Sequence, residues 1–242
     1  MIFAAGLGTR LRPLTDEIPK ALVEVGGTPM LEHVARRLVG AGATRLIVNV
    51  HHHAEKVRRF IAERQGFGVE TLVSDETELL LDTGGGLRNA APLFHHDAPF
   101  LIHNVDVVTN MDLACLYDAH CGSGALATLA VLERDSRRYL VFDAQGLCGY
   151  GGPQGELLAR PPQGSVQRLG FTGIHAISPG IFSMIEEEGV FSIIPLYMRL
   201  AAAGQRILPH RVDGARWIDI GSPEKLAQAR EMDLPSMFPN GL

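Results

Sequence analysis

The sequence predicts an α/β fold built on a parallel β-sheet. Short apolar segments, which suit buried strands, alternate along the chain with amphipathic segments that suit helices. Such alternation is typical of βαβ units with right-handed crossovers. Two glycine-rich segments, residues 4–20 and 81–91, lie between expected strands and helices. In open α/β sheets this is the kind of position at which ligands bind.

The positions of the expected elements follow from hydrophobic periodicity and from turn residues. Strands are expected at residues 1–5, 45–50, 69–73, 99–103, 125–132, 139–142, 171–177 and 206–212. Helices are expected at residues 30–39, 54–63, 112–120, 193–203 and 222–232, with Asp112 and Ser222 at two of their starts. Residues 146–170 are rich in Gly, Pro and Gln and predict a mobile hairpin and loop. With no repeat or linker, residues 1–233 are expected to form one domain and residues 234–242 a loose tail.

Composition indicates an ordinary globular protein with a substantial core. Of the 242 residues, 46% are hydrophobic and 20% are charged, and the net charge is −5. The negative charge argues against a nucleic-acid partner, and the lack of a signal peptide or long apolar run argues against a membrane partner. Three cysteines without a Cys-x-x-Cys pair suit a reducing, cytoplasmic location. The run His51–His53 is expected to be a polar helix start, because three adjacent histidines do not converge on one metal ion.

The first glycine-rich segment, Ala4–Lys20, has the features of a phosphate-binding loop. Gly6 and Gly8 allow the backbone to bend tightly and to approach a ligand, and successive amides in such a turn hold anions. The segment also carries three cations, Arg10, Arg12 and Lys20. A bare Gly-x-Gly would be equally consistent with a solvated surface turn. The segment is neither a Walker A loop, which needs a Gly-Lys pair, nor a dinucleotide fingerprint, which needs a third glycine at the position of Leu11.

The complete segment resembles the signature loop of the sugar-1-phosphate nucleotidyltransferases. That pattern is Gly-x-Gly-Thr-Arg-Leu-x-Pro-Leu-Thr-x-x-x-Pro-Lys, and every specified position is met from Gly6 to Lys20. The resemblance implies a Rossmann-like α/β fold with a mixed, mainly parallel sheet flanked by helices. It also implies an enzyme that joins a nucleoside triphosphate to a sugar 1-phosphate and releases pyrophosphate. In this segment it implies nucleotide contacts from Ala4, Ala5, Gly6, Gly8, Thr9 and Arg10.

The second glycine-rich segment contains three consecutive glycines, Gly84–Gly86. Such a run suggests a turn that something approaches closely, although a plain helix-capping loop is the simpler alternative. In the family that the chain resembles, a Gly-rich turn after the third strand holds the base. The version Asp82–Gly86 is similar to the branch that transfers uridylyl groups to N-acetylmuramate 1-phosphate. Nucleotide contacts are therefore expected from Thr83, Gly84, Gly85, Gly86 and Asn104, and Gly85→Val is expected to block the base pocket without harming the fold.

Two carboxylates are candidate ligands of Mg²⁺. Asp106 follows the buried strand at residues 99–103, where an aspartate could equally cap the next helix. The resemblance implies that Asp106 and Asp219 hold the metal, Asp219 within the motif Trp217–Pro223. Val105 departs from the family, which usually has glycine before the first aspartate.

The chemistry implied by the resemblance needs positioning rather than a general base, because a sugar 1-phosphate is already an anion at neutral pH. Arg10 is expected to stabilise charge on the departing pyrophosphate, and Lys20 to hold the α-phosphate or the sugar phosphate. Four residues are thus expected to be catalytic, namely Arg10, Lys20, Asp106 and Asp219.

The sugar site is expected at the strand Phe171–Ile177, which resembles the family strand that lines the sugar pocket. Sugar contacts are expected from Thr172, Gly173 and Asp106. Many relatives carry Glu-Lys-Pro before this strand; here Ala159-Arg160-Pro161 stands instead, and Arg160 is the alternative cation. The missing lysine favours UTP with N-acetylmuramate 1-phosphate. A mannose-1-phosphate guanylyltransferase and a non-catalytic nucleotide-binding protein remain the alternatives.

Overall fold

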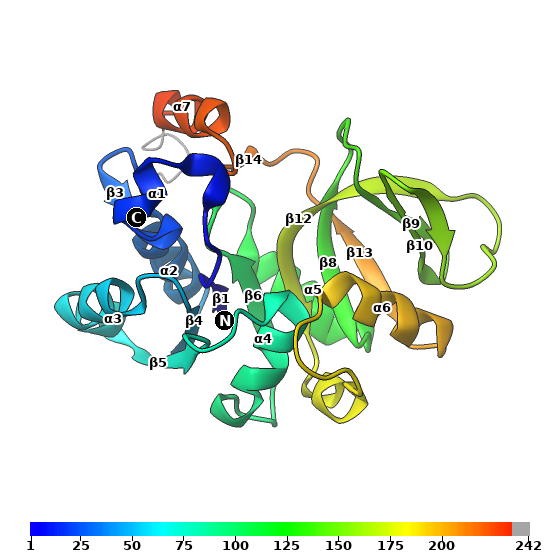
Figure 1. Ribbon diagram of the computed structural model, residues 1–242. Coiled ribbons are helices and arrows are strands. Elements are labelled where there is room, and N and C mark those ends of the chain that lie inside the picture. Colours follow the sequence, from blue (N-terminus) through cyan, green and yellow to red (C-terminus); the bar gives the residue numbers. More distant parts are fainter. Residues whose placement is uncertain (234–242) are drawn as a thin grey trace.

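The centre of the fold is a mixed β-sheet in the computed structural model, which describes residues 1–233 (Figure 1). The strands of this sheet are β1 (Ile2–Phe3), β4 (Arg45–Val50), β5 (Glu70–Asp75), β6 (Phe100–Asn104), β8 (Ala127–Leu132), β9 (Tyr139–Asp143), β10 (Gly146–Gly152), β11 (Gly155–Leu158), β12 (Gln167–Ile177) and β13 (Ile207–Arg211). Their order is β11-β10-β9-β12-β6-β1-β4-β5, with β8 paired to both β12 and β13. The strands β6, β1, β4 and β5 are parallel, whereas β12 runs antiparallel to β6, β8 and β9.

Helices cover both faces of this sheet. The longer ones are α2 (Met30–Gly40), α3 (Ala54–Glu63), α4 (Asp82–Ala90), α5 (Leu113–Ser123), α6 (Ile193–Ala202) and α7 (Pro223–Glu231). The shorter ones are α1 (Leu14–Glu17), η1 (Thr9–Leu11), η2 (Lys20–Leu22), η3 (Gln65–Gly68), η4 (Ala91–Leu93) and η5 (Pro179–Met184). Two small ladders complete the fold, β2 (Glu24–Val25) with β3 (Thr28–Pro29), and β7 (Val107–Thr109) with β14 (Trp217–Asp219). None of these helices combines the length and hydropathy needed to cross a bilayer, within residues 1–233.

Each face of the sheet has its own hydrophobic core. Along β4, Leu46, Val48 and Val50 belong to one core and Ile47 to the other, as the alternation of side chains along a strand requires. The first core includes residues of α2 and α3, and the second includes residues of α4 and α6. Because both faces are covered, the central parallel strands are apolar along most of their length.

The predicted Rossmann-like α/β fold is confirmed, and most expected helices and strands are found within a few residues of their expected bounds. The Asp112 side chain caps α5 by accepting a hydrogen bond from the Cys115 amide at 2.9 Å, and Ser222 precedes α7. Residues 146–170 contain the expected hairpin, β10 with β11, which extends the main sheet. The expected tail at residues 234–242 lies outside the described part of the chain.

Strand order brings distant parts of the chain to one edge of the sheet. The short β1 lies between β4 and β6, with Ile2 paired to both Val48 and His103. The segment that follows β1 therefore starts at the carboxyl ends of the parallel strands, where α/β proteins bind ligands. Figure 1 shows this segment beside β14 and α7, which come from the other end of the chain.

Candidate active site

The segment after β1 folds back on itself and leaves part of its backbone open. Gly8 has a φ of 66°, in the left-handed region that favours glycine, and its carbonyl accepts a hydrogen bond from the buried Thr15 hydroxyl at 2.8 Å. Gly6 is exposed, and a side chain there would meet no atom within 4 Å. A ligand can therefore approach the backbone at Gly6 directly.

The three cations of this segment have different environments. The Lys20 side chain is 12% exposed, and its ammonium forms an ion pair with the Asp106 carboxylate. Arg10 is exposed beside the site. Arg12 instead pairs with Asp16 at 3.1 Å on the surface, with both side chains more than half exposed. Arg10 and Lys20 therefore lie beside the two candidate metal ligands, whereas Arg12 points to the surface.

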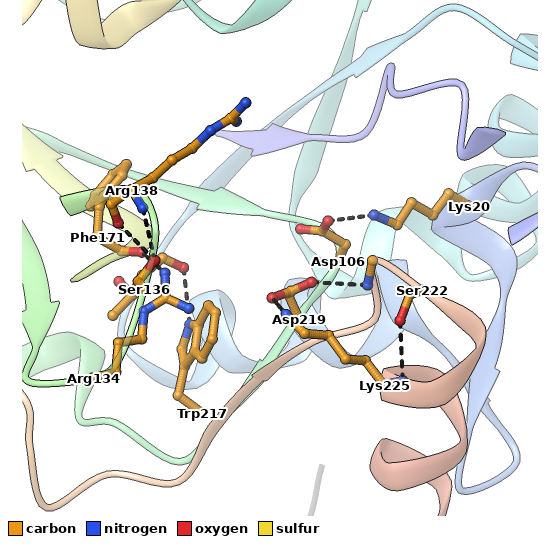
Figure 2. A network of polar contacts seen from close by, with 12 residues as sticks. Lys20, Asp106, Arg134, Ser136, Arg138, Phe171, Trp217, Asp219, Ser222 and Lys225 are labelled. Atoms are coloured by element: carbon orange, nitrogen blue, oxygen red, sulfur yellow. Dashed lines mark hydrogen bonds and ion pairs between the residues drawn. The ribbon is translucent and has the colours of Figure 1, made fainter. Parts of the chain in front are cut away.

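The two candidate metal ligands come together through the ladder of β7 and β14. Asp219 is opposite Val107, and the Ile220 amide donates a hydrogen bond to the Asp106 carbonyl at 2.8 Å. Figure 2 shows the two carboxylates close to each other, each facing a lysine. Asp219 accepts hydrogen bonds from the Lys225 ammonium and, at 3.0 Å, from the Gly221 amide. Residues 113 positions apart in sequence thus share one site.

Positive charge surrounds both carboxylates. Burial alone would raise the pKa of Asp219, but the Lys225 ammonium and the Gly221 amide hold that pKa below its ordinary value. A Cβ atom on Gly221 would lie 2.5 Å from Asp219 Oδ1 and 2.7 Å from Arg10 Nη2, so glycine is required where these two groups approach. Asp219 remains ionised, with Arg10 next to it.

The residues present fit a divalent cation that is shared with phosphate oxygens. Mg²⁺ is usually held by one or two carboxylates, and water or substrate phosphate completes its coordination. Asp106 and Asp219 supply two such carboxylates. In this structure their negative charges are neutralised by the ammonium groups of Lys20 and Lys225, as a bound cation would neutralise them. Within residues 1–233, no cluster of three or more His, Cys, Asp or Glu side chains could hold a metal by itself. His51–His53 lies in the turn before α3, with His53 immediately before Ala54.

A cavity of about 380 Å³ adjoins these groups. Among the expected nucleotide contacts, Ala5, Gly6, Thr83 and Asn104 line it, together with Lys20 and Asp106. Its other polar lining residues are Asn49, Glu76 and Asp82. The cavity therefore connects the open backbone at Gly6 with the start of α4.

The three consecutive glycines do not form the expected open turn. Gly84, Gly85 and Gly86 lie buried inside α4, and the amides of the first two donate to the Phe191 carbonyl at 2.9 and 3.1 Å. A Cβ atom at Gly84 would overlap the Phe191 ring, and one at Gly85 would overlap the Gly189 carbonyl oxygen. The close neighbour that these glycines accommodate is the protein itself. Gly85→Val is therefore expected to destabilise the fold, contrary to the expectation that it would act on a base pocket alone.

Two buried polar residues, Asn49 and Glu76, were not found from the sequence. Asn49 Oδ1 accepts a hydrogen bond from the Ala4 amide at 2.7 Å, and its Nδ2 donates to Glu76 Oε1 at 2.7 Å. Glu76 Oε2 accepts from the Leu81 amide at 3.1 Å. Burial raises the pKa of Glu76, against the effect of these hydrogen bonds. This chain of hydrogen bonds joins the start of the first glycine-rich segment to the start of α4.

The strand expected to line the sugar pocket, β12, differs from expectation at Thr172. Its hydroxyl donates to the Ala130 carbonyl at 2.8 Å and is buried in the sheet, because the pairing of β12 with β8 shifts register between Phe171 and His175. Gly173, with a φ of 82°, packs against Asn104, and a Cβ atom there would overlap the Asn104 amide. The Thr172 carbonyl accepts from Trp217 Nε1 at 3.0 Å. Of the two expected sugar contacts on this strand, only Gly173 is oriented toward the site residues.

Arg160, the alternative cation to the missing lysine, is engaged by another residue. Its guanidinium forms a two-fold ion pair with Asp143, at 2.6 and 2.7 Å, and also donates to the Gly146 carbonyl. This pair holds the pKa of Asp143 well below its ordinary range. A different arginine, Arg134, lies over the Trp217 ring with its guanidinium carbon 4.3 Å from the ring centroid (Figure 2). No sequence motif pointed to Arg134 or to Lys225.

An open amide loop, two neighbouring carboxylates and several cations at the carboxyl edge of a parallel sheet define a site for transfer between phosphate-bearing substrates. The chain matches the family model described as nucleotidyl transferase over residues 1–235. The chain therefore belongs to the nucleotidyl transferase family, and it is a sugar-1-phosphate nucleotidyltransferase of nucleotide-sugar biosynthesis. The alternative of a non-catalytic binding protein is set aside.

Individual relatives agree with this membership. The chain is 33% identical to an N-acetylmuramate alpha-1-phosphate uridylyltransferase from Caulobacter vibrioides, over 94% of this chain and 93% of that protein. It is 28% identical to a mannose-1-phosphate guanyltransferase from Gibberella zeae, where it spans 65% of that protein. The fold is similar to a UDP-glucose pyrophosphorylase from Acinetobacter baumanii, with a TM-score of 0.77 and 19% identity over 99% of this chain and 96% of that one.

Proposed function

We propose that the enzyme transfers a uridylyl group from UTP to N-acetylmuramate 1-phosphate. The observation that carries this proposal is the 33% identity to the Caulobacter vibrioides uridylyltransferase, which extends over nearly the whole of both chains. The mannose-1-phosphate guanylyltransferase alternative is supported by weaker identity to a longer protein. The absence of a Glu-Lys-Pro lysine, with Arg160 engaged by Asp143, also favours the uridylyl reaction.

We infer that the nucleotide occupies the cavity between Gly6 and the start of α4. The triphosphate would lie along the first glycine-rich segment, from Ala5 to Thr9 and Arg10, since Gly6 admits a ligand, while Ala4 with its amide bound by Asn49 would support the segment from behind. The base would lie toward Leu80–Thr83, where the cavity ends. Gly84 and Gly85 would then act by letting α4 pack closely against the segment at residues 189–191, and Gly86 by letting α4 approach Asn49 and Glu76.

The reaction would proceed by positioning and charge neutralisation. Lys20 would hold the α-phosphate or the sugar phosphate, because its ammonium already faces Asp106 inside the cavity. Arg10 would stabilise the pyrophosphate that leaves, since it is the exposed cation beside Asp219. Asp106 and Asp219 would hold Mg²⁺. When bound, the metal would neutralise phosphate charge during the in-line displacement. The sugar phosphate oxygen is already anionic, so no residue is required to remove a proton.

The test is a grid of substrates read by pyrophosphate release. Four nucleoside triphosphates are combined with the 1-phosphates of N-acetylmuramate, N-acetylglucosamine, glucose and mannose, with Mg²⁺ present. UTP with N-acetylmuramate 1-phosphate is expected to be the best pair. UTP is expected to exceed GTP at least about tenfold in kcat/KM, a difference of about 1.4 kcal/mol. If GTP with mannose 1-phosphate is the best pair, the proposed substrates are wrong.

A further inference from the structure

Arg134 is a half-buried cation beside the site that lacks a counter-ion among residues 1–233. Its Nη2 donates to the Phe171 carbonyl at 3.0 Å, whereas its buried Nε has no hydrogen-bond partner among the described residues. No carboxylate within residues 1–233 forms an ion pair with it. Burial lowers the pKa of Arg134, and the charge of Asp219 partly offsets that effect. An arginine with these surroundings can still accept an anion, and a partly dehydrated guanidinium interacts with one strongly.

Two neighbours hold Arg134 in place. Its guanidinium lies on the Trp217 ring, and the Trp217 indole N–H is itself fixed by the Thr172 carbonyl. On the other side, the absence of a side chain at Gly170 leaves room for the arginine, because a Cβ atom there would overlap Nε. Gly170 has an ordinary strand conformation, so this glycine is required by the arginine and not by the backbone.

Arg134 lies away from the two lysine–aspartate pairs at which the phosphates are proposed to bind (Figure 2). Figure 2 shows the pairs Lys20–Asp106 and Asp219–Lys225 on one side of Trp217, and Arg134 against that ring on the other. Lys225 is 6.0 Å from the centroid of the same ring. A sugar whose 1-phosphate lies at Asp106 and Asp219, and whose ring passes Gly173, would direct its other substituents toward Trp217 and Arg134.

We propose that Arg134 selects sugar 1-phosphates that carry a carboxylate, by pairing with that carboxylate at the end of the site away from the reacting phosphate. The inference rests on the proposed function, because N-acetylmuramate differs from N-acetylglucosamine by a lactyl ether that bears such a group. Arg134 is then a specificity-determining residue. The guanidinium discriminates against neutral sugars, because they would leave its partly dehydrated charge without a counter-ion.

The experiment compares two substrates in four proteins. Steady-state kinetics with UTP are measured for N-acetylmuramate 1-phosphate and for N-acetylglucosamine 1-phosphate. The proteins are the wild type, Arg134→Gln, Gly170→Ala, and Arg137→Gln as a control that removes an exposed charge from the same loop. Arg134→Gln is expected to lower kcat/KM about thirtyfold for the acidic sugar, equivalent to about 2 kcal/mol. For the neutral sugar the expected change is less than about threefold.

Gly170→Ala keeps the positive charge of Arg134 but displaces it. It is therefore expected to lower the ratio of kcat/KM for the acidic sugar to kcat/KM for the neutral sugar, by a smaller factor than Arg134→Gln does. Arg137→Gln is expected to leave the ratio unchanged. Because Trp217 is the only tryptophan in the chain, its fluorescence gives an independent binding curve for each sugar 1-phosphate. Arg134→Gln is expected to weaken binding of the acidic sugar alone.

Equal losses for both sugars in Arg134→Gln, or no loss, would overturn the inference while the proposed substrate stands. A second pair of substrates, glucuronate 1-phosphate and glucose 1-phosphate, tests the inference independently of the proposed substrate. If N-acetylmuramate 1-phosphate is not a substrate but the wild type prefers glucuronate and Arg134→Gln loses that preference, the proposed substrate is wrong and the inference stands. A wild type with no preference for an acidic sugar in either pair would overturn both.

Discussion

At Gly6 the space where a side chain would begin is open, whereas at Gly85 the same space is filled by the backbone of the 189–191 segment. Both glycines belong to glycine-rich segments near the carboxyl ends of parallel strands, and both segments border one cavity through Gly6 and Thr83. In the first, the backbone is accessible to a ligand. In the second, it is accessible only to another part of the chain. A glycine run therefore indicates close approach without indicating what approaches.

The difference extends to the hydrogen bonds of the two segments. In the first segment, the Gly8 carbonyl accepts a hydrogen bond from the Thr15 hydroxyl, and the backbone before it, at Gly6, stays open to a ligand. Gly84 and Gly85 are fixed by their amides, which both reach the Phe191 carbonyl. Amides are the groups that bind phosphate or the acceptors of a base. The first segment is thus suited to binding, and the second to holding α4 against the chain near α6.

The largest effect is expected at Arg10, the cation of the open segment. Arg10→Ala should lower kcat about a hundred- to a thousandfold, with a smaller effect on nucleotide affinity, because its charge matters most as pyrophosphate leaves. Its free energy of unfolding should stay within about 0.5 kcal/mol of the wild type, since the side chain is exposed. Arg12→Ala is the matched control and should keep its turnover, because Arg12 pairs with Asp16 on the surface. Loss of affinity with unchanged kcat would make Arg10 a ground-state phosphate clamp.

The carboxylates are expected to give the next largest effect. Asp106→Asn and Asp219→Asn should each reduce turnover at least about a hundredfold, because each removes a metal-binding charge. The measurement is pyrophosphate release as a function of Mg²⁺ concentration, and removal of the metal from the wild type should give a comparable loss. Wild-type activity at limiting Mg²⁺ in either variant would remove that residue from the metal site.

Gly85 and Gly6 provide a direct test of the contrast in packing. Gly85→Val should lower the free energy of unfolding by about 2 to 3 kcal/mol, because its Cβ atom would overlap a backbone oxygen. Gly6→Val meets open space and should change that free energy by no more than about 0.5 kcal/mol, while it raises KM for the nucleotide. Urea unfolding of both variants is the measurement. Equal stabilities for the two would show that the second segment is as open as the first.

The hydrogen bonds that join the two segments should contribute a smaller amount. Asn49→Ala would leave the Ala4 amide and one Glu76 oxygen without partners in a buried position. The free energy of unfolding is expected to fall by about 1 to 3 kcal/mol. The kcat is also expected to fall, because Ala4 begins the first glycine-rich segment, which carries Arg10 and Lys20. Asn89→Ala, at an exposed asparagine of α4, is the control and should cost less. An Asn49 variant with wild-type stability would mean that these hydrogen bonds do not couple the segments.

Sequence predicted most of the fold, and it singled out Arg10, Lys20, Asp106 and Asp219, which the structure brings together, because both depend on local patterns. The alternation of strands and helices is readable along the chain, and the signature from Gly6 to Lys20 is continuous in sequence. Asp106 and Asp219 were each marked by the motif around them. Their proximity through β7 and β14 agrees with that expectation.

The remaining features depend on strand register and on packing between distant segments. Asn49 reaches Glu76 because β4 pairs with β5, and no residue near either one signals this contact. Thr172 turns inward because β12 shifts register against β8. The same strand places Gly170 under Arg134. Gly84 and Gly85 in α4 contact residues 189–191, more than a hundred positions later in the chain, and Gly86 contacts Asn49 and Glu76.

The most direct test of the contrast between the two glycine-rich segments is turnover per folded molecule in Arg10→Ala and Gly85→Val. Both proteins are assayed with UTP at a temperature where urea unfolding gives the folded fraction. Arg10→Ala should be fully folded and at least about a hundredfold slower. Gly85→Val should be less stable, yet its folded molecules should turn over and bind UTP within about threefold of the wild type, about 0.7 kcal/mol. A Gly85→Val protein with wild-type stability that has lost UTP binding would contradict this contrast. It would show that the base binds against the three glycines Gly84–Gly86.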